Sequence, residues 1–416
     1  MTIANAVNKN VIIGLQSAKG TIAAADLATA QTLRFLKFSQ NQTNETYTSN
    51  ERRPDRQVGD VNLGPQEMPG SLSGELSPAT YKQFMAAILR QTWQAGVTMN
   101  AAATDNVAAA ATTGAAGTFT RDDVDGSFLT DGFKIGDVVR WTGWDAPATA
   151  NNNHNFLITG LTATVMTVLG VDGVPPEARA KGDTVACAVA GKKCWTPSTG
   201  HTEDWFTIEH NYSDVDLSEV FTDCKASSMA IKAPATGIPT VDFNILGLDM
   251  TPKSAGDAPY FTAALGVTTT QAVLSGKAVI LVSGVVQTLA TGIDFDVAGN
   301  NTVMAPVLGT NVKPGISDGR VEAKGNLSVY FEDATLRDYF RAGTEVSINA
   351  VFPVSDAANA DFIAISIPAV VLTGGTKDGD KEILQTIPFS AKFNSVGGSA
   401  VNTLATTVSI QDSAVS

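Results

Sequence analysis

The stretch PGSLSGELSPATYKQFM, residues 69–85, returns near the end of the chain as KGNLSVYFEDATLRDYF, residues 324–340. The positions that keep residue type and spacing are Gly70, Leu72, Ser73, Ala79 and Thr80 against Gly325, Leu327, Ser328, Ala334 and Thr335. Each copy reads as a strand that leads into a helix. One such unit has a single apolar face, which a second unit can cover. The sequence therefore predicts an internal duplication, with chance similarity among frequent small residues as the alternative.

The helix of the first copy is the clearest in the sequence. We expect it to begin at Ser77, an N-cap residue, with Pro78 at the first helical position. Its apolar stripe predicts packing against a sheet and consists of Tyr81, Phe84, Met85, Ile88 and Leu89. In the second copy a shorter helix is expected from about Asp333 through Arg341, with Gly343 as its stop.

Composition predicts a mainly β protein. The chain has 416 residues and only 17% charged residues, with abundant Gly, Ala, Thr, Ser and Val, which is typical of many short strands. A net charge of −13 disfavours nucleic-acid binding, because that affinity comes from clustered Lys and Arg. There is no long apolar run and no basic-then-apolar leader, so we expect a soluble protein without a membrane partner. Cys187, Cys194 and Cys224 predict neither a disulfide framework nor a metal pair.

Two low-complexity stretches, residues 99–117 and 196–204, predict linkers around an inserted module. Between them, residues 118–196 contain short apolar segments separated by Gly, Asp, Asn and Pro turns. This pattern predicts a small all-β domain. Because linkers enclose it on both sides, we expect this domain to project outward from the body and not to form part of the core of the body.

The remaining residues, 1–99 and 205–416, are expected to form one β-sandwich or barrel domain with a flanking helix. Within it, residues 1–32 are weakly patterned and predict an N-terminal arm. Residues 39–69 have few apolar anchors and predict a long loop. Such a loop either reaches another copy of the chain or is a mobile surface loop.

No residue pattern in the chain indicates catalysis or a cofactor. His201 and His210 flank the run HTEDWFTIEH, but an extended strand would hold them up to ~30 Å apart, too far for one metal ion. The run RDDVDG, which begins at Arg121, fails as a calcium loop because arginine stands at the first ligand position. Phosphate-loop, dinucleotide and nucleophile-elbow motifs are missing from the sequence. A β-fold glycosidase with distant carboxylates is the enzymatic alternative.

Three regions together resemble a tail tube protein of long-tailed, non-contractile bacteriophages. They are the run from Gly59 to Tyr81, the block 206–247 with its EVFTDC and GIPTVDF motifs, and the closing segments from Asp361 to Phe393. The resemblance covers most of the chain outside residues 118–196, and that module resembles accessory domains that decorate some tail exteriors. It implies a tail-tube β-sandwich in hexameric rings, stacked into a tube through which genomic DNA passes into the host.

The resemblance also implies partners and a place of action. The protein would bind other copies of itself, and the tape measure, tail terminator and distal tail proteins. DNA would pass through the lumen without specific binding, because acidic residues along the bore would repel it. The protein would be made in the host cytoplasm and would function in the virion tail.

The long loop and the N-terminal arm would bridge adjacent rings in such a tube. Candidate interface residues are Arg52, Arg53, Arg56 and Glu67. The three arginines could form ion pairs with carboxylates of the next subunit. The alternative is that they lie on a face exposed to solvent.

A second function class is a carbohydrate-binding surface protein. Trp141 and Trp144 could form an aromatic platform in the module of residues 118–196. Glycan binding by the isolated module would favour this alternative.

Overall fold

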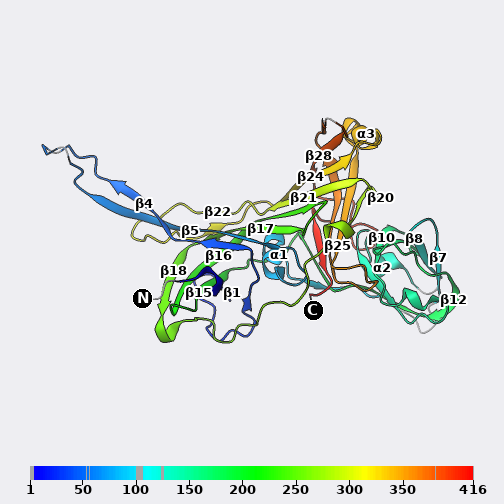
Figure 1. Ribbon diagram of the computed structural model, residues 1–416, viewed down its shortest axis with the longest axis horizontal. Coiled ribbons are helices and arrows are strands. Elements are labelled where there is room, and N and C mark those ends of the chain that lie inside the picture. The colour runs from blue at the N-terminus through cyan, green and yellow to red at the C-terminus, as the bar shows by residue number, and fades with distance from the viewer. Residues whose placement is uncertain are drawn as a thin grey trace.

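The structure is a computed structural model that describes residues 4–52, 54–55, 57–99, 106–122, 126–379 and 381–415. The fold is mainly β, as the composition predicts, with a large sheet in the body of the molecule and a smaller sheet formed by residues 106–189. Figure 1 shows a long hairpin at one end of the molecule and the smaller sheet at the other. This arrangement leaves the hairpin surrounded by little of its own chain.

The body is built around one long strand, β16 (Leu217–Pro234). Its first half pairs with β15 (Phe206–Tyr212) and β18 (Asp249–Ser254). Its second half pairs with β17 (Thr240–Gly247) and β21 (Ala290–Ala298). A bulge early in the second half allows the strand to bend from one ladder into the other.

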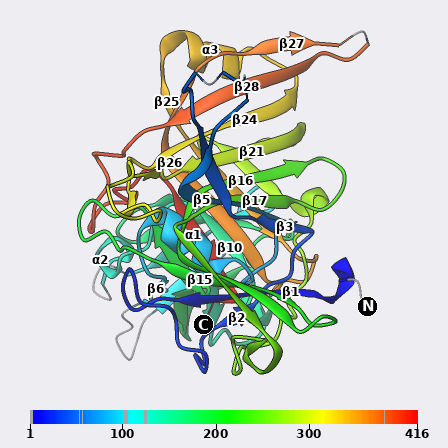
Figure 2. The ribbon, with the colours of Figure 1, turned by 90° about the vertical axis from the view of Figure 1, so that its left-hand side faces the viewer.

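The two copies of the repeated stretch occupy equivalent places on either side of β16. The strand β5 (Val61–Glu75) pairs with β17, and β24 (Glu322–Tyr330) pairs with β21. Each strand is therefore two steps from β16, and antiparallel pairing at every step makes β5 and β24 run in the same direction. Each leads into a helix, α1 (Lys82–Leu89) or α3 (Thr335–Ala342). Figure 2 shows β24, β21, β16 and β17 as successive strands, and this placement supports the duplication.

Helix α1 begins later than predicted. Residues 78–81 form a turn in which Ala79 has a positive φ of 62°. The Ser77 hydroxyl donates to the Thr80 hydroxyl at 2.8 Å and caps no helix. The backbone N–H of Ala79 donates to the Asp412 carboxylate at 2.7 Å, so a distant strand decides the local geometry. In α3 the predicted stop is confirmed, because Gly343 is its left-handed C-cap.

The main hydrophobic core lies inside the large sheet, which curls back on itself. The curl is closed through β24, which pairs with β28 (Leu384–Ala391), and β28 in turn pairs with β26 (Phe362–Leu372). Strand β26 also pairs with β25 (Glu345–Pro353). The predicted stripe of α1 faces this core: the Phe84 ring lies 5.3 Å from Phe206 and 5.5 Å from Phe243, measured between ring centroids. The other strands of the body are β1 (Lys9–Leu15), β2 (Gln31–Thr32), β3 (Lys37–Gln40), β4 (Thr43–Thr48), β6 (Gln94–Ala95), β14 (Lys192–Trp195), β19 (Val279–Val282), β20 (Val285–Val286), β22 (Thr302–Val303), β23 (Ile316–Ser317), β27 (Thr376–Asp378) and β29 (Ser409–Asp412).

The smaller sheet has its own hydrophobic core, which includes Phe119, Trp141 and Phe156. Its elements are β7 (Asn106–Ala111), β8 (Ala116–Arg121), α2 (Phe128–Asp131), β9 (Val138–Thr142), β10 (Phe156–Leu161), β11 (Val165–Gly170), β12 (Arg179–Thr184) and β13 (Ala186–Val189). We call residues 106–190 the insert.

The boundaries of the insert differ from the predicted range 118–196 on both sides. Strand β7 lies before residue 118, in an alanine-rich stretch that reads as a linker. Strand β14 lies inside the predicted range but pairs with β29 and β6 of the body. Alanine carries little periodic signal, and a strand of four residues is too short to show which sheet it joins. Residues 100–105 of the predicted linker lie outside the described residues.

Two further expectations about the body were wrong. Residues 39–69, expected as a loop, contain the second half of β3, all of β4 and the first part of β5. Residues 1–32, expected as an arm, contain β1, which pairs with β15 along its whole length and buries Val11 completely. In both segments the strand partner is distant in sequence, so local patterning gives little sign of the pairing.

Candidate assembly surfaces

The hairpin of β4 and β5 projects from the body as a two-stranded ribbon (Figure 1). Thr46 lies opposite Leu63, and Thr48 lies opposite Val61, so these four side chains share one face. Val61 is 59% exposed and Leu63 is 66% exposed. We call this the ribbon face. It is an apolar and threonine-rich surface that the described part of the chain leaves open to solvent.

The opposite face of the ribbon is covered by its own tyrosine. The ring of Tyr47 lies over Gly64, where a Cβ atom would approach the ring to 2.5 Å. The Tyr47 hydroxyl donates to the Glu45 carboxylate at 2.9 Å. Glycine is thus required for the tyrosine to lie flat. An isolated two-stranded ribbon is marginally stable in water, so contact between the ribbon face and another molecule would stabilise it.

The two predicted interface residues that the structure describes, Arg52 and Glu67, lie at different ends of this ribbon. Arg52 is exposed in the connection beyond the ribbon, between β4 and β5. Arg53 and Arg56 lie outside the residues that the structure describes. Glu67 lies near the base of the ribbon and forms an ion pair with Lys313, while the neighbouring Gln66 N–H donates to the Asn311 carbonyl at 2.9 Å. The structure therefore does not bring Glu67 together with Arg52.

A second surface is the outward face of the sheet around β16. Opposed residues in successive strands share a face, and one row across the sheet reads Ser73, Asp242, Ala230, Asp296, Lys324 and Ser390. The next row contains Thr240, Lys232, Asp294, Asn326 and Pro388. We call these rows the polar sheet face. Phe243, Phe295 and Leu327 alternate with them and are buried on the other side.

The charges of the polar sheet face nearly compensate each other. Lys232 lies 3.7 Å from the Asp242 carboxylate, and Lys324 lies 3.6 Å from that of Asp296. Asp294 remains as the acidic excess, and its pKa is raised by partial burial, an effect that Lys232 opposes. The face therefore carries small hydroxyl and amide groups with a slight negative balance.

The other candidate sites are not assembled. His210 is 1% exposed, and its pKa is lowered to about 3 by burial and then by Lys9. His201 is exposed, in the segment between the insert and β15. In the part of the chain that the structure describes, no group of His, Cys, Asp and Glu is arranged to hold a metal ion. All three cysteines are buried and unpaired.

The aromatic platform of the carbohydrate-binding alternative is not present. Trp141 is fully buried and Trp144 is 2% exposed. Their rings pack on Phe119, with centroid distances of 4.5 and 5.8 Å. Both tryptophans are therefore core residues of the insert. Among the described helices, none is both long enough and apolar enough to cross a membrane.

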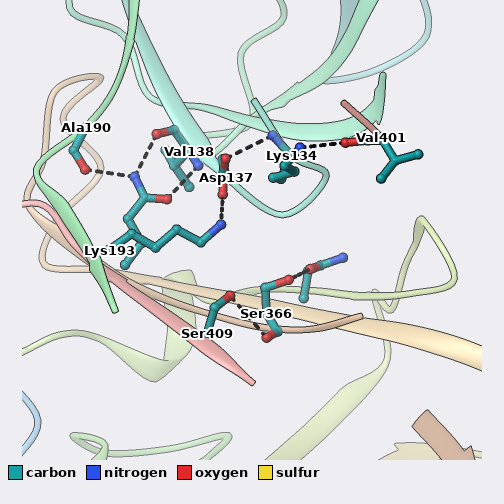
Figure 3. Close-up of polar contacts among 10 residues, drawn as sticks. Lys134, Asp137, Val138, Ala190, Lys193, Ser366, Val401 and Ser409 are labelled. Carbon is teal, nitrogen blue, oxygen red and sulfur yellow. Dashed lines mark hydrogen bonds and ion pairs between the residues drawn. The ribbon is translucent and has the colours of Figure 1, made fainter. Parts of the chain in front are cut away.

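The junction between the insert and the body is polar, buried and unforeseen from the sequence. Asp137 of the insert forms an ion pair with Lys193 of β14, and Figure 3 shows it between Lys193 and Lys134. The Lys134 ammonium group donates to the carbonyls of Ser399 and Val401 at 2.7 and 2.6 Å. These partners come from separate parts of the chain, so no local motif marks them.

Hydrogen bonds and apolar contacts complete the junction. The side-chain amide of Gln411 accepts from the Val138 N–H at 2.9 Å and donates to the Val138 and Ala190 carbonyls, both at 2.8 Å. Around it, an apolar cluster joins Leu157 of the insert to Phe362 of the body. The main hydrophobic core of the body contains no residue of the insert that the structure describes, and these junction contacts hold the insert against the body beside that core.

A family described as "Phage tail tube protein" matches residues 8–391, a range that includes the body and the insert. No curated protein matches the chain closely enough to add a second comparison. The match covers nearly the whole sequence, and it agrees with the mainly β fold. The chain belongs to the phage tail tube protein family.

Proposed function

We propose that this protein polymerises into hexameric rings that stack into the tail tube of a long-tailed, non-contractile phage. The observation that carries the proposal is the ribbon face. Val61 and Leu63 are mostly exposed on a ribbon that projects away from its own chain. Covering such a surface is favourable by about 25 cal/mol per Å² of apolar area, so a second copy gains stability by receiving it.

The polar sheet face is our candidate for the lining of the bore. Its serine, threonine and asparagine side chains offer few cations to phosphates, because Lys232 and Lys324 are each close to a carboxylate. Such a wall is slightly acidic, so it attracts the phosphates of passing DNA only weakly. We infer a conduit role without catalysis or a cofactor.

The partners that follow from this role are other copies of the chain, the tape measure protein, the tail terminator and the distal tail proteins. The protein would be made in the host cytoplasm and act in the virion tail during DNA ejection. The insert, which lies at the end of the molecule away from the ribbon, would project outward from the tube (Figure 1).

The test is negative-stain electron microscopy of the purified full chain, together with the mass of the ring species by native mass spectrometry. Rings or tubes with a central bore are expected, and a ring mass of six chains would support the hexamer. Each chain carries two strand-to-helix units. A ring mass of three chains would therefore mean that the ring contains six such units from three chains, and it would replace the hexamer in this proposal. A protein that stays monomeric at high concentration would contradict the whole proposal.

A further inference from the structure

We propose that the ribbon face of one copy docks into a groove between β20 and α3 of a second copy. This inference rests on the proposed self-assembly and names the surface that receives the ribbon.

Apolar side chains lie on both walls of the groove, among polar ones such as Gln287, Thr288 and Gln385. On one side, the turn at Ser283 and Gly284, both with positive φ, directs β20 outward and leaves Val285 61% exposed and Val286 38% exposed. On the other side are Leu336 and Tyr339 of α3, which reach the main core with part of their surfaces.

Two further side chains extend this apolar surface. Leu289 is 42% exposed and Tyr330 is 41% exposed, and both line the same groove. A cluster of half-exposed apolar side chains around a concavity is typical of a protein contact site.

The ribbon of a second copy fits this groove in chemistry. Val61 and Leu63 supply the apolar face, flanked by the methyl groups of Thr46 and Thr48. Figure 1 shows the ribbon projecting away from α3 and β20, so a chain cannot place its own ribbon in its own groove.

A single charge contact, through Arg52, is available to the same occupant, beside carboxylates of the ribbon segment such as Glu45 and Glu51. The rim of the groove carries Glu332 and Asp333 at the start of α3. The pKa of the Asp333 carboxyl is lowered by hydrogen bonds from the Thr335 N–H and hydroxyl, so this carboxyl is negatively charged at neutral pH and stays so into the acid range. Arg52 lies four residues beyond Thr48, within about 13 Å if extended, and brings a cation to this rim when the ribbon docks.

The test is a cysteine pair, Leu63→Cys with Val286→Cys, in the full chain. The native cysteines are buried, so oxidation of the assembled protein reports on the engineered pair. We expect a ladder of disulfide-linked chains on a non-reducing gel. The matched control pairs Leu63→Cys with Val396→Cys, which is 78% exposed and outside the groove, and it should give no ladder.

Electron microscopy of the same samples separates the two proposals. Rings or tubes without a ladder, or with a ladder only in the Val396→Cys control, would overturn the docking site and leave self-assembly in place. Monomers without rings would overturn both.

A second variant tests the groove without a cross-link. Val286→Asp should raise the concentration needed for assembly about tenfold or more, which corresponds to the loss of one buried apolar contact. Val174→Asp, at a position of the insert that is 50% exposed, should leave assembly unchanged. Equal effects of the two variants would count against the groove.

Discussion

The ion pair at the junction gives the sharpest stability prediction. Asp137 is 2% exposed, pairs with Lys193 and accepts from the Lys134 N–H at 3.0 Å. Burial lowers the pKa of Lys134, and the charge of Asp137 opposes that effect. The variant Asp137→Ala removes the carboxylate and leaves the Lys193 ammonium group, on a residue only 8% exposed, without this counter-charge. Breaking one partner of a buried pair costs about 3–5 kcal/mol.

That loss is large against the whole stability of a protein, which is typically about 5–15 kcal/mol. A matched control is Asp242→Ala on the polar sheet face. Asp242 and Lys232 lie 3.7 Å apart, with side chains 41% and 61% exposed, so their pair should contribute less than about 1 kcal/mol. A second control, Asp137→Leu with Lys193→Met, removes both charges and should recover most of the loss.

The assay is urea unfolding of the dilute, unassembled protein, followed by tryptophan fluorescence and by circular dichroism. The junction contacts predict that the insert and the body unfold in one transition, which Asp137→Ala moves to lower urea. An Asp137→Ala variant that loses no more stability than Asp242→Ala would contradict this prediction. A separate unfolding transition of the insert in the wild-type protein would contradict it as well.

Three further outcomes are expected. Burial lowers the pKa of His210 to about 3 and raises the pKa of Asp412 to about 6. As pH rises from about 4 to 6, the His210 shift therefore increases the free energy of unfolding and the Asp412 shift decreases it. Each effect is about 1.4 kcal/mol per pH unit. His210→Phe should therefore make the urea midpoint fall over this pH range and Asp412→Asn should make it rise, and parallel profiles for wild type and variants would contradict the pKa values. Gly74→Ala should cost about 1–3 kcal/mol in thermal unfolding, because its Cβ would lie 1.8 Å from the Tyr81 hydroxyl, whereas Gly256→Ala has open space and should be neutral. Trp144→Ala should cost about 3–5 kcal/mol in thermal unfolding because the ring is buried, and a loss below about 1 kcal/mol would contradict its place in the core of the insert.

Much of the body could be predicted because its signals are local. The repeated stretch places Leu72 and Leu327 on the buried side of their strands, and both precede a helix. The stripe from Tyr81 to Leu89 has the helical period that core packing requires. Gly343 ends α3 because glycine adopts the left-handed conformation without strain. Each of these features is decided by residues within a few positions of each other.

The features that could not be predicted depend on distant partners. The turn before α1 is held by Asp412, which no local pattern connects to Ala79. The junction joins Asp137 to Lys193 and Lys134 to the carbonyl of Val401. Polar residues inside apparent strands or loops look solvated in the sequence. Only the fold shows that they are buried and paired.

The ribbon is a different case, because its sequence did carry a signal that composition concealed. Val61 and Leu63 alternate around an asparagine, and Thr46 and Thr48 alternate around Tyr47, so each strand has a period of two. The segment has few apolar positions, so it resembles a loop if its apolar side chains are expected to be buried within the same chain. The alternation makes sense when the cover comes from a second copy. A segment with strand periodicity but too little apolar surface for its own core is therefore a sequence-level sign of assembly, and here it coincides with the ribbon that the structure leaves open.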